Sequence, residues 1–195
     1  MDTNPYAAPS ASLEMPADTA ASYYVVGLRK FTLLYFFTMG LYTIYWFYQN
    51  WVLQKRRHKE SLWPVPRSIF NIFFCHTLFR RVRGEIDRQQ IAYDWNADVT
   101  ATVYVLLSVV SNVLQRISAR DVDSVQVDVI SLLLLPAIYF PLRSAQKAIN
   151  VAEQDSEGAG NAALTPANYA WVLMGAIWWV VVALGIALIL GWVQV

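Results

Sequence analysis

Four long runs of apolar residues alternate with shorter polar segments along the chain, at residues 31–53, 99–115, 124–142 and 171–193. A helix rises about 1.5 Å per residue, so roughly twenty apolar residues cover the hydrocarbon thickness of a bilayer. The last run is the clearest, because no charged residue occurs between Asn161 and Val195. The pattern predicts an all-α integral membrane protein with about four hydrophobic helices.

The first run is uncharged over residues 31–54 but contains Gly40 near its middle. Glycine costs a helix about 1 kcal/mol relative to alanine, and it permits a turn. The run therefore forms either one spanning helix or a re-entrant hairpin, whose two short arms enter and leave the membrane on the same face. Its length favours the spanning helix, and the side of the membrane that holds the N-terminus stays open.

Residues 67–83 have arginine at both ends and four phenylalanines between them, Phe70, Phe73, Phe74 and Phe79. The apolar part is too short to span, and this composition is typical of an amphipathic helix lying in the membrane interface. We expect its aromatic side chains to be immersed and nearby cations to contact anionic headgroups. The simpler interpretation, that these cations only fix the topology, is favoured. The candidate headgroup contacts are Lys55, Arg56, Arg57, Lys59, Arg67, Arg80, Arg81 and Arg83.

Basic residues are concentrated in one part of the chain: nine of the fifteen Lys and Arg residues lie within residues 55–88. Loops rich in Lys and Arg stay on the cytoplasmic side of a membrane. The loop 55–98 is therefore predicted to be cytoplasmic, with the C-terminus on the opposite side. Because the basic residues are local and the net charge is only +1, no nucleic-acid partner is predicted.

The second apolar run carries polar residues spaced three and four apart, which places them on one face of a helix. Such a face most often makes hydrogen bonds to a neighbouring helix, and this interpretation is favoured over a polar pathway through the membrane. The third run adds one acidic residue at membrane depth, where ionisable groups are expensive. The candidate intramembrane polar face consists of Ser108, Ser111, Asn112, Gln115 and Asp128.

The last run has small residues every four positions, at Ala183, Ala187 and Gly191. A stripe of small side chains lets another helix approach closely. We therefore expect this stripe to pack against a helix, and a homo-oligomer or a complex with other membrane proteins is a predicted assembly.

Motifs of catalytic chemistry are absent from the sequence, which contains no nucleophile elbow, phosphate-binding loop or metal-spaced histidine pair. No catalytic, cofactor-binding or metal-binding residue is predicted. His76 is the candidate titratable residue, a proton or pH sensor, although a histidine satisfied by a neighbouring carbonyl or tyrosine is the favoured interpretation. Cys75 is the single cysteine and cannot form an intramolecular disulfide.

Several blocks of the sequence resemble a family of small bacterial inner-membrane proteins that carry a domain of unknown function. The blocks are residues 29–31, 38–42 and 45–51, then Pro64, Arg67, residues 73–74, His76, residues 78–80, residues 146–150 and Asn168. The resemblance covers roughly residues 24–171. It implies a place in the bacterial inner membrane, and it supplies no catalytic residue to carry over.

Residues 1–22 are rich in Pro, Ala and Ser and are expected to form a disordered tail. Residues 23–195 are expected to form a single membrane domain. The predicted function is that of a non-catalytic multi-pass inner-membrane protein acting through protein or lipid partners, with anionic lipids among them. Two alternatives stay open: a small oligomeric transporter or channel that uses the polar face of the second span, and a lipid-modifying membrane enzyme.

Overall fold

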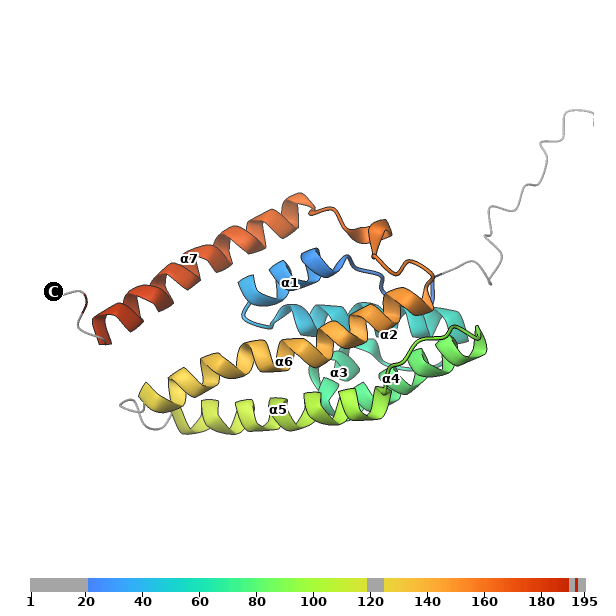
Figure 1. The fold of residues 1–195 in the computed structure, drawn as a ribbon, viewed down its shortest axis with the longest axis horizontal. Helices are drawn as coiled ribbons and strands as arrows, with labels where there is room; N and C mark the ends of the chain where they lie inside the picture. The colour runs from blue at the N-terminus through green and yellow to red at the C-terminus, as the bar shows by residue number, and fades with distance from the viewer. Residues whose placement is uncertain (1–20, 119–124, 190–191, 193–195) are drawn as a thin grey trace, which may run out of the picture.

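The computed structural model describes residues 21–118, 125–189 and 192 of the chain, and within these ranges it is helical and contains no strand. The expected tail over residues 1–22 lies almost wholly outside the described ranges. Figure 1 shows the arrangement of the helices. The elements are α1 (Leu28–Phe37), α2 (Tyr42–His58), α3 (Pro64–Ile69), α4 (Asn71–Arg88), α5 (Ala97–Ser118), α6 (Val125–Ala152), the 3₁₀ helix η1 (Ala159–Asn161) and α7 (Pro166–Ile189).

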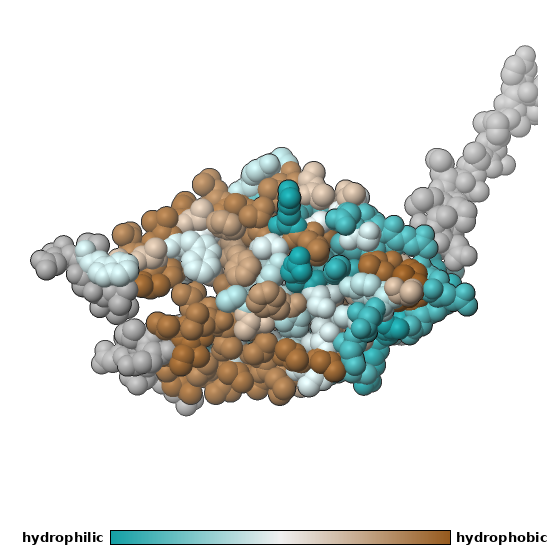
Figure 2. Space-filling view, viewed as in Figure 1, coloured by the Kyte–Doolittle hydropathy of each residue, from teal (hydrophilic) through white to brown (hydrophobic). Residues whose placement is uncertain are grey.

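Three helices, α5, α6 and α7, are long and apolar enough to cross a membrane. They correspond to the second, third and fourth apolar runs. Hydrophobic residues cover the half of the molecule where α5 and α6 join and α7 ends, whereas hydrophilic residues gather at the opposite end, around α4 (Figures 1 and 2). The surface therefore divides along these helices, as in a protein placed partly in lipid.

The first apolar run does not form one continuous helix, so the favoured prediction of a spanning helix over 31–53 is wrong. Helix α1 ends at Phe37 and α2 begins at Tyr42. Between them, Met39 and Gly40 have φ angles of 52° and 83°, in the left-handed region that ends a helix. At about 1.5 Å per residue, the ten residues of α1 extend only half of the roughly 30 Å needed to span.

Helices α1 and α2 form a hairpin whose two ends meet. The backbone N–H of Tyr24 donates to Asn50 Oδ1 at 3.1 Å, and Gln54 Nε2 donates to the carbonyl of Ser22 at 2.9 Å. The residues that enter α1 therefore lie beside the second half of α2, while the turn at 38–41 lies at the other end of the pair. Figure 1 shows this hairpin against α6.

Helix α4 packs its apolar face into the protein and not into lipid. Its buried residues recur at helical spacing and belong to the main core. Phe79 is fully buried there, so the expectation that the aromatic side chains of residues 67–83 are immersed in the membrane interface is wrong for this residue. Phe73 keeps the expected exposure, with 72% of its surface accessible. The core reaches α4 because α4 packs against both α5 and α6.

Helix α6 runs without interruption from Val125 to Ala152, through Pro136 and Pro141. The third apolar run ends at residue 142, so the helix continues for ten residues into the polar segment that follows the run. That extension carries the buried polar residues Gln146 and Asn150.

The non-helical segment 22–27 is held by hydrogen bonds between its backbone and side-chain carboxamides. Asn150 accepts the N–H of Val26 at 3.3 Å and donates to its carbonyl at 2.9 Å, while Gln146 donates to the carbonyl of Tyr24 at 3.2 Å. Gln146 also accepts a hydrogen bond from the indole N–H of Trp46 in α2 and donates to Asn150 at 2.7 Å. This buried carboxamide network joins α2, α6 and the entrance to α1, which fixes where the hairpin lies.

Candidate functional site

A cavity of about 1350 Å³ lies between α5, α6 and α7. At the side nearest α2 and α4 it is lined by residues 39–41, 43 and 44, which belong to the hairpin turn and the start of α2. Residues 69–72, which join α3 to α4, line the same side. Its walls along the membrane direction come from the three helices that are able to span. We call this space the intramembrane cavity.

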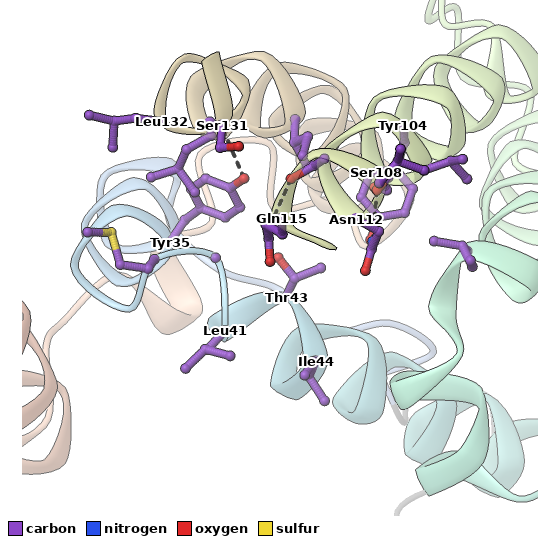
Figure 3. Close-up of a pocket in the computed structure, with 18 of the residues that line it drawn as sticks. Tyr35, Leu41, Thr43, Ile44, Tyr104, Ser108, Asn112, Gln115, Ser131 and Leu132 are labelled. Carbon is purple, nitrogen blue, oxygen red and sulfur yellow. Dashed lines mark hydrogen bonds between the residues drawn. The ribbon is translucent and has the colours of Figure 1, made fainter. Parts of the chain in front are cut away.

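The polar wall of the intramembrane cavity is supplied by α5. Asn112 and Gln115 are exposed there, and they face the same hollow as Thr43 of α2 (Figure 3). Ser108 and Ser111 also line the cavity but are almost fully buried. The predicted polar face of the second span is therefore brought together, with two carboxamides on the open side and two hydroxyls behind them.

The favoured interpretation expected the carboxamides of this face to bond to a neighbouring helix, and within the described residues they do not do so. Asn112 Nδ2 donates to the carbonyl of Ser108 at 2.7 Å, and Gln115 Nε2 donates to Ser111 Oγ at 3.0 Å, so both bonds stay within α5. Each carboxamide has two donor hydrogens and an accepting oxygen. One donor of each side chain is accounted for by these bonds, and the remaining groups face the cavity.

The side chain of Asp128, the charged member of the predicted face, lies outside the described residues, although its backbone belongs to α6. On the same helix, Ser131 lines the cavity, and its hydroxyl is buried without a hydrogen-bond partner in the described part of the chain. The hydroxyl of Tyr104 is bonded to Asn71 Oδ1 at 2.5 Å, which ties α5 to the start of α4.

Helix α7 forms the third wall and stands apart from the other two. Among the described residues it packs on α1 and makes no helix-to-helix contact with α5 or α6. The contact is close: a Cβ atom on Gly175 would lie 1.8 Å from the carbonyl oxygen of Phe37, and Trp179 Nε1 donates to the carbonyl of Phe36 at 3.0 Å. Helix α7 therefore lines the intramembrane cavity without packing on the α5–α6 pair, and Figure 1 shows its ribbon apart from these two helices.

The close helix contact uses Gly175 and not the stripe of small residues predicted further along α7. Ala183 is exposed and Ala187 is half-buried, while Gly191 lies outside the described residues. Sequence spacing did not single out Gly175 because an isolated glycine in an apolar run has no partner visible in the sequence. Its role depends on where α1 ends.

The predicted headgroup contacts fall into two groups. In the first group, Arg80 pairs with Asp98, Arg81 with Glu60 and Arg83 with Asp87, and Arg67 is stacked over the rings of Trp51 and Phe74 at 4.6 and 4.9 Å. The hydrogen bond from Arg81 lowers the pKa of the Glu60 carboxyl. The second group lies at the end of α2, where Lys55, Arg56 and Lys59 are exposed and Arg57, which also takes part in an intramolecular interaction, is half-buried. Lys55, Arg56 and Lys59 are exposed cations at the surface, where headgroups could reach them.

His76, the candidate titratable residue, shares a hydrogen bond of 3.1 Å with the hydroxyl of Thr102 on α5. The partner is a threonine hydroxyl where the favoured interpretation named a carbonyl or a tyrosine. Cys75 beside it is buried in the core, and burial raises the pKa of its thiol to about 11. Within the described residues no group of three or more His, Cys, Asp or Glu side chains is arranged to hold a metal ion.

Comparison with protein-family models, curated proteins and solved structures finds no match to this chain. The resemblance to small bacterial inner-membrane proteins therefore stays a prediction. The residues that carry that resemblance include Trp46, Gln146 and Asn150, which form the buried carboxamide network.

Proposed function

We propose that this chain is a non-catalytic multi-pass protein of the bacterial inner membrane, and that it holds a transmembrane helix of a partner membrane protein in the intramembrane cavity. The observation that carries the proposal is the cavity itself, a space lined by three membrane-capable helices, of which α7 does not pack on the other two and α5 supplies most of the polar side chains. A space of this kind admits a neighbour from within the bilayer without passage through water.

The volume of the cavity favours an occupant larger than a small molecule. The cavity measures about 1350 Å³, whereas small-molecule sites are typically about 300–1,000 Å³. A segment of partner helix is an occupant of the larger kind.

The polar wall selects the kind of helix. Within the described part of the chain, Asn112 and Gln115 each use one donor in a hydrogen bond inside α5, and Ser131 contributes a hydroxyl without a partner. In hydrocarbon such groups need a hydrogen-bonding neighbour, and in membranes helix pairs are joined by Ser, Thr, Asn and Gln side chains and by close packing of small residues. The expected partner is a spanning helix with polar and small residues on one face.

The alternative of an oligomeric transporter or channel requires a polar path that is open at both ends. Residues 39–41, 43 and 44 and residues 69–72 bound the cavity on the side of α2 and α4. Within the described residues the space is therefore limited on one side, which favours holding a partner over conducting a solute.

A photoreactive benzoylphenylalanine in place of Asn112 tests the proposal in intact membranes. We expect irradiation to join the chain to a protein of defined mass, seen as one discrete larger band, because the position faces the cavity. The matched control is Leu106, an exposed residue of the same helix that does not line the cavity, where the probe should capture lipid.

Equal capture of lipid at positions 112 and 106, with no discrete protein adduct, would contradict the proposal. A discrete adduct of twice the mass of the chain would identify the partner as a second copy. Filling the cavity with Ser131→Trp should abolish the adduct at position 112 while the chain still accumulates in the membrane.

The orientation that we propose has the hairpin α1–α2 re-entrant and the loop 55–98 in the cytoplasm. The two ends of the hairpin lie together, since Tyr24 bonds to Asn50. The ten residues of α1 are too few to span, and the last turn of α2 consists of the basic residues Lys55–His58, which shortens its apolar part. We therefore expect alkaline phosphatase to be inactive when fused before Met1 or after Arg88 and active when fused after Val195. Activity of the fusion before Met1 would show that the first run spans.

A further inference from the structure

A second cavity, of about 430 Å³, lies between the hairpin α1–α2 and the start of α7. It is separate from the intramembrane cavity, although Leu41 at the hairpin turn borders both. Its lining combines a lysine, tyrosine and threonine hydroxyls, and asparagine side chains with a few apolar residues. The residues that the argument uses are Lys30, Tyr42, Asn161, Thr165, Asn168 and Trp171.

The first unusual feature of this cavity is a buried ammonium group. Lys30 is only 4% exposed, and its Nζ donates to Asn161 Oδ1 at 2.7 Å and to the carbonyl of Ala163 at 2.8 Å. Both partners are neutral, and an ammonium has three hydrogens to donate. Burial of a charge is expensive unless an opposite charge accompanies it, so the position calls for an anion that supplies both the charge and the third acceptor.

The second feature is an unsatisfied hydroxyl on another residue of the lining. Tyr42 is 7% exposed and lines the cavity, and its hydroxyl has no hydrogen-bond partner in the described part of the chain. A buried hydroxyl without a partner costs free energy. An anion bound near Lys30 would accept this hydrogen.

The third feature is the beginning of α7, where Thr165 and Asn168 bond reciprocally, from Thr165 N to Asn168 Oδ1 and from Asn168 N to Thr165 Oγ1. The N-terminus of a helix carries a partial positive charge that favours anions. Because α7 is a membrane-capable helix that begins here, this end also marks the depth of the lipid headgroups. Trp171, on the cavity wall, is of the residue type enriched at that depth.

From these features we propose that the second cavity binds the phosphate group of an anionic phospholipid. Lys30 supplies the charge, the Tyr42 hydroxyl donates a hydrogen bond, and the N-terminus of α7 adds its dipole. Leu34, Leu41 and Trp171 line the same cavity and provide apolar contact for the glycerol and the first part of the acyl chains.

The test measures binding of phosphatidylglycerol to the full-length chain in detergent by native mass spectrometry. Tyr42→Phe removes only a hydroxyl without a hydrogen-bond partner in the described part of the chain, so we expect the fold to be retained. The apparent affinity should fall about tenfold, the loss of one hydrogen bond to a charged group. Lys30→Met should weaken binding at least as much. The matched control Lys147→Met neutralises an exposed lysine of α6 that belongs to neither cavity nor to the predicted headgroup contacts, and it should change the affinity less than twofold.

Unchanged binding in Tyr42→Phe and Lys30→Met would overturn the proposal. An equal loss in Lys147→Met would also overturn it, since that result indicates attraction to positive charge on the chain as a whole. Titration with inorganic phosphate separates the two sources of a phosphate group. Saturation by inorganic phosphate alone, with no preference for phosphatidylglycerol, would remove the lipid from the assignment.

Discussion

Replacing Asn150 with leucine is expected to lower the free energy of unfolding by about 3 kcal/mol or more, because each buried polar group left unpaired costs about 1–3 kcal/mol. Asn150 is fully buried and serves both the N–H and the carbonyl of Val26, and it also accepts from Gln146. Leucine has a similar volume, so the loss is one of hydrogen bonds and not of packing. The measurement is the midpoint of denaturation of the purified chain in detergent.

The control for this change is Asn112→Leu, the same substitution at an exposed site whose hydrogen bond, to the carbonyl of Ser108, lies within its own helix. We expect a cost of at most about 1 kcal/mol there, since hydrogen bonds between membrane helices average about 0.6 kcal/mol. Comparable losses at positions 150 and 112 would show that the carboxamide network does not hold residues 22–27 in place. The hairpin would then depend on its aromatic packing alone.

Replacing Gly175 with alanine is expected to displace α7 from α1 and to destabilise the chain by about 3 kcal/mol, at the upper end of the cost of overpacking. The added Cβ would lie 1.8 Å from the carbonyl oxygen of Phe37. That atom is backbone and has no rotamer by which to move away. The hydrogen bond from Trp179 to Phe36 is lost when the helices separate, and the same denaturation midpoint reports the change.

Gly185→Ala on the same helix provides a control of opposite sign. A Cβ there meets no atom within 4 Å, and alanine is favoured over glycine inside a helix by about 1 kcal/mol. We therefore expect Gly185→Ala to keep or raise the stability while Gly175→Ala lowers it. Equal effects of the two changes would mean that α7 does not pack on the end of α1.

The sequence by itself determined the properties that depend on neighbouring residues along one helix. The lengths of the apolar runs identified α5, α6 and α7 as membrane-capable, because spanning depends only on composition and on the rise per residue. Helical spacing also placed Ser108, Ser111, Asn112 and Gln115 on one face of α5, and that face lines the intramembrane cavity. Gly40 indicated the hairpin as an alternative. The length of the first apolar run favoured a single spanning helix, and for this segment length was the weaker guide.

Only the tertiary structure decided which partners these faces meet. An apolar stripe looks the same in sequence whether it packs on protein or on lipid, so the burial of Phe79 in the core depended on α4 lying against α5 and α6. Gly175 and Lys30 acquire their roles from segments far away in sequence, the end of α1 and the loop around Asn161. Hydrogen bonds and close contacts across more than a hundred residues leave no periodic pattern, because each requires two positions whose distance is set by the fold and not by the chain.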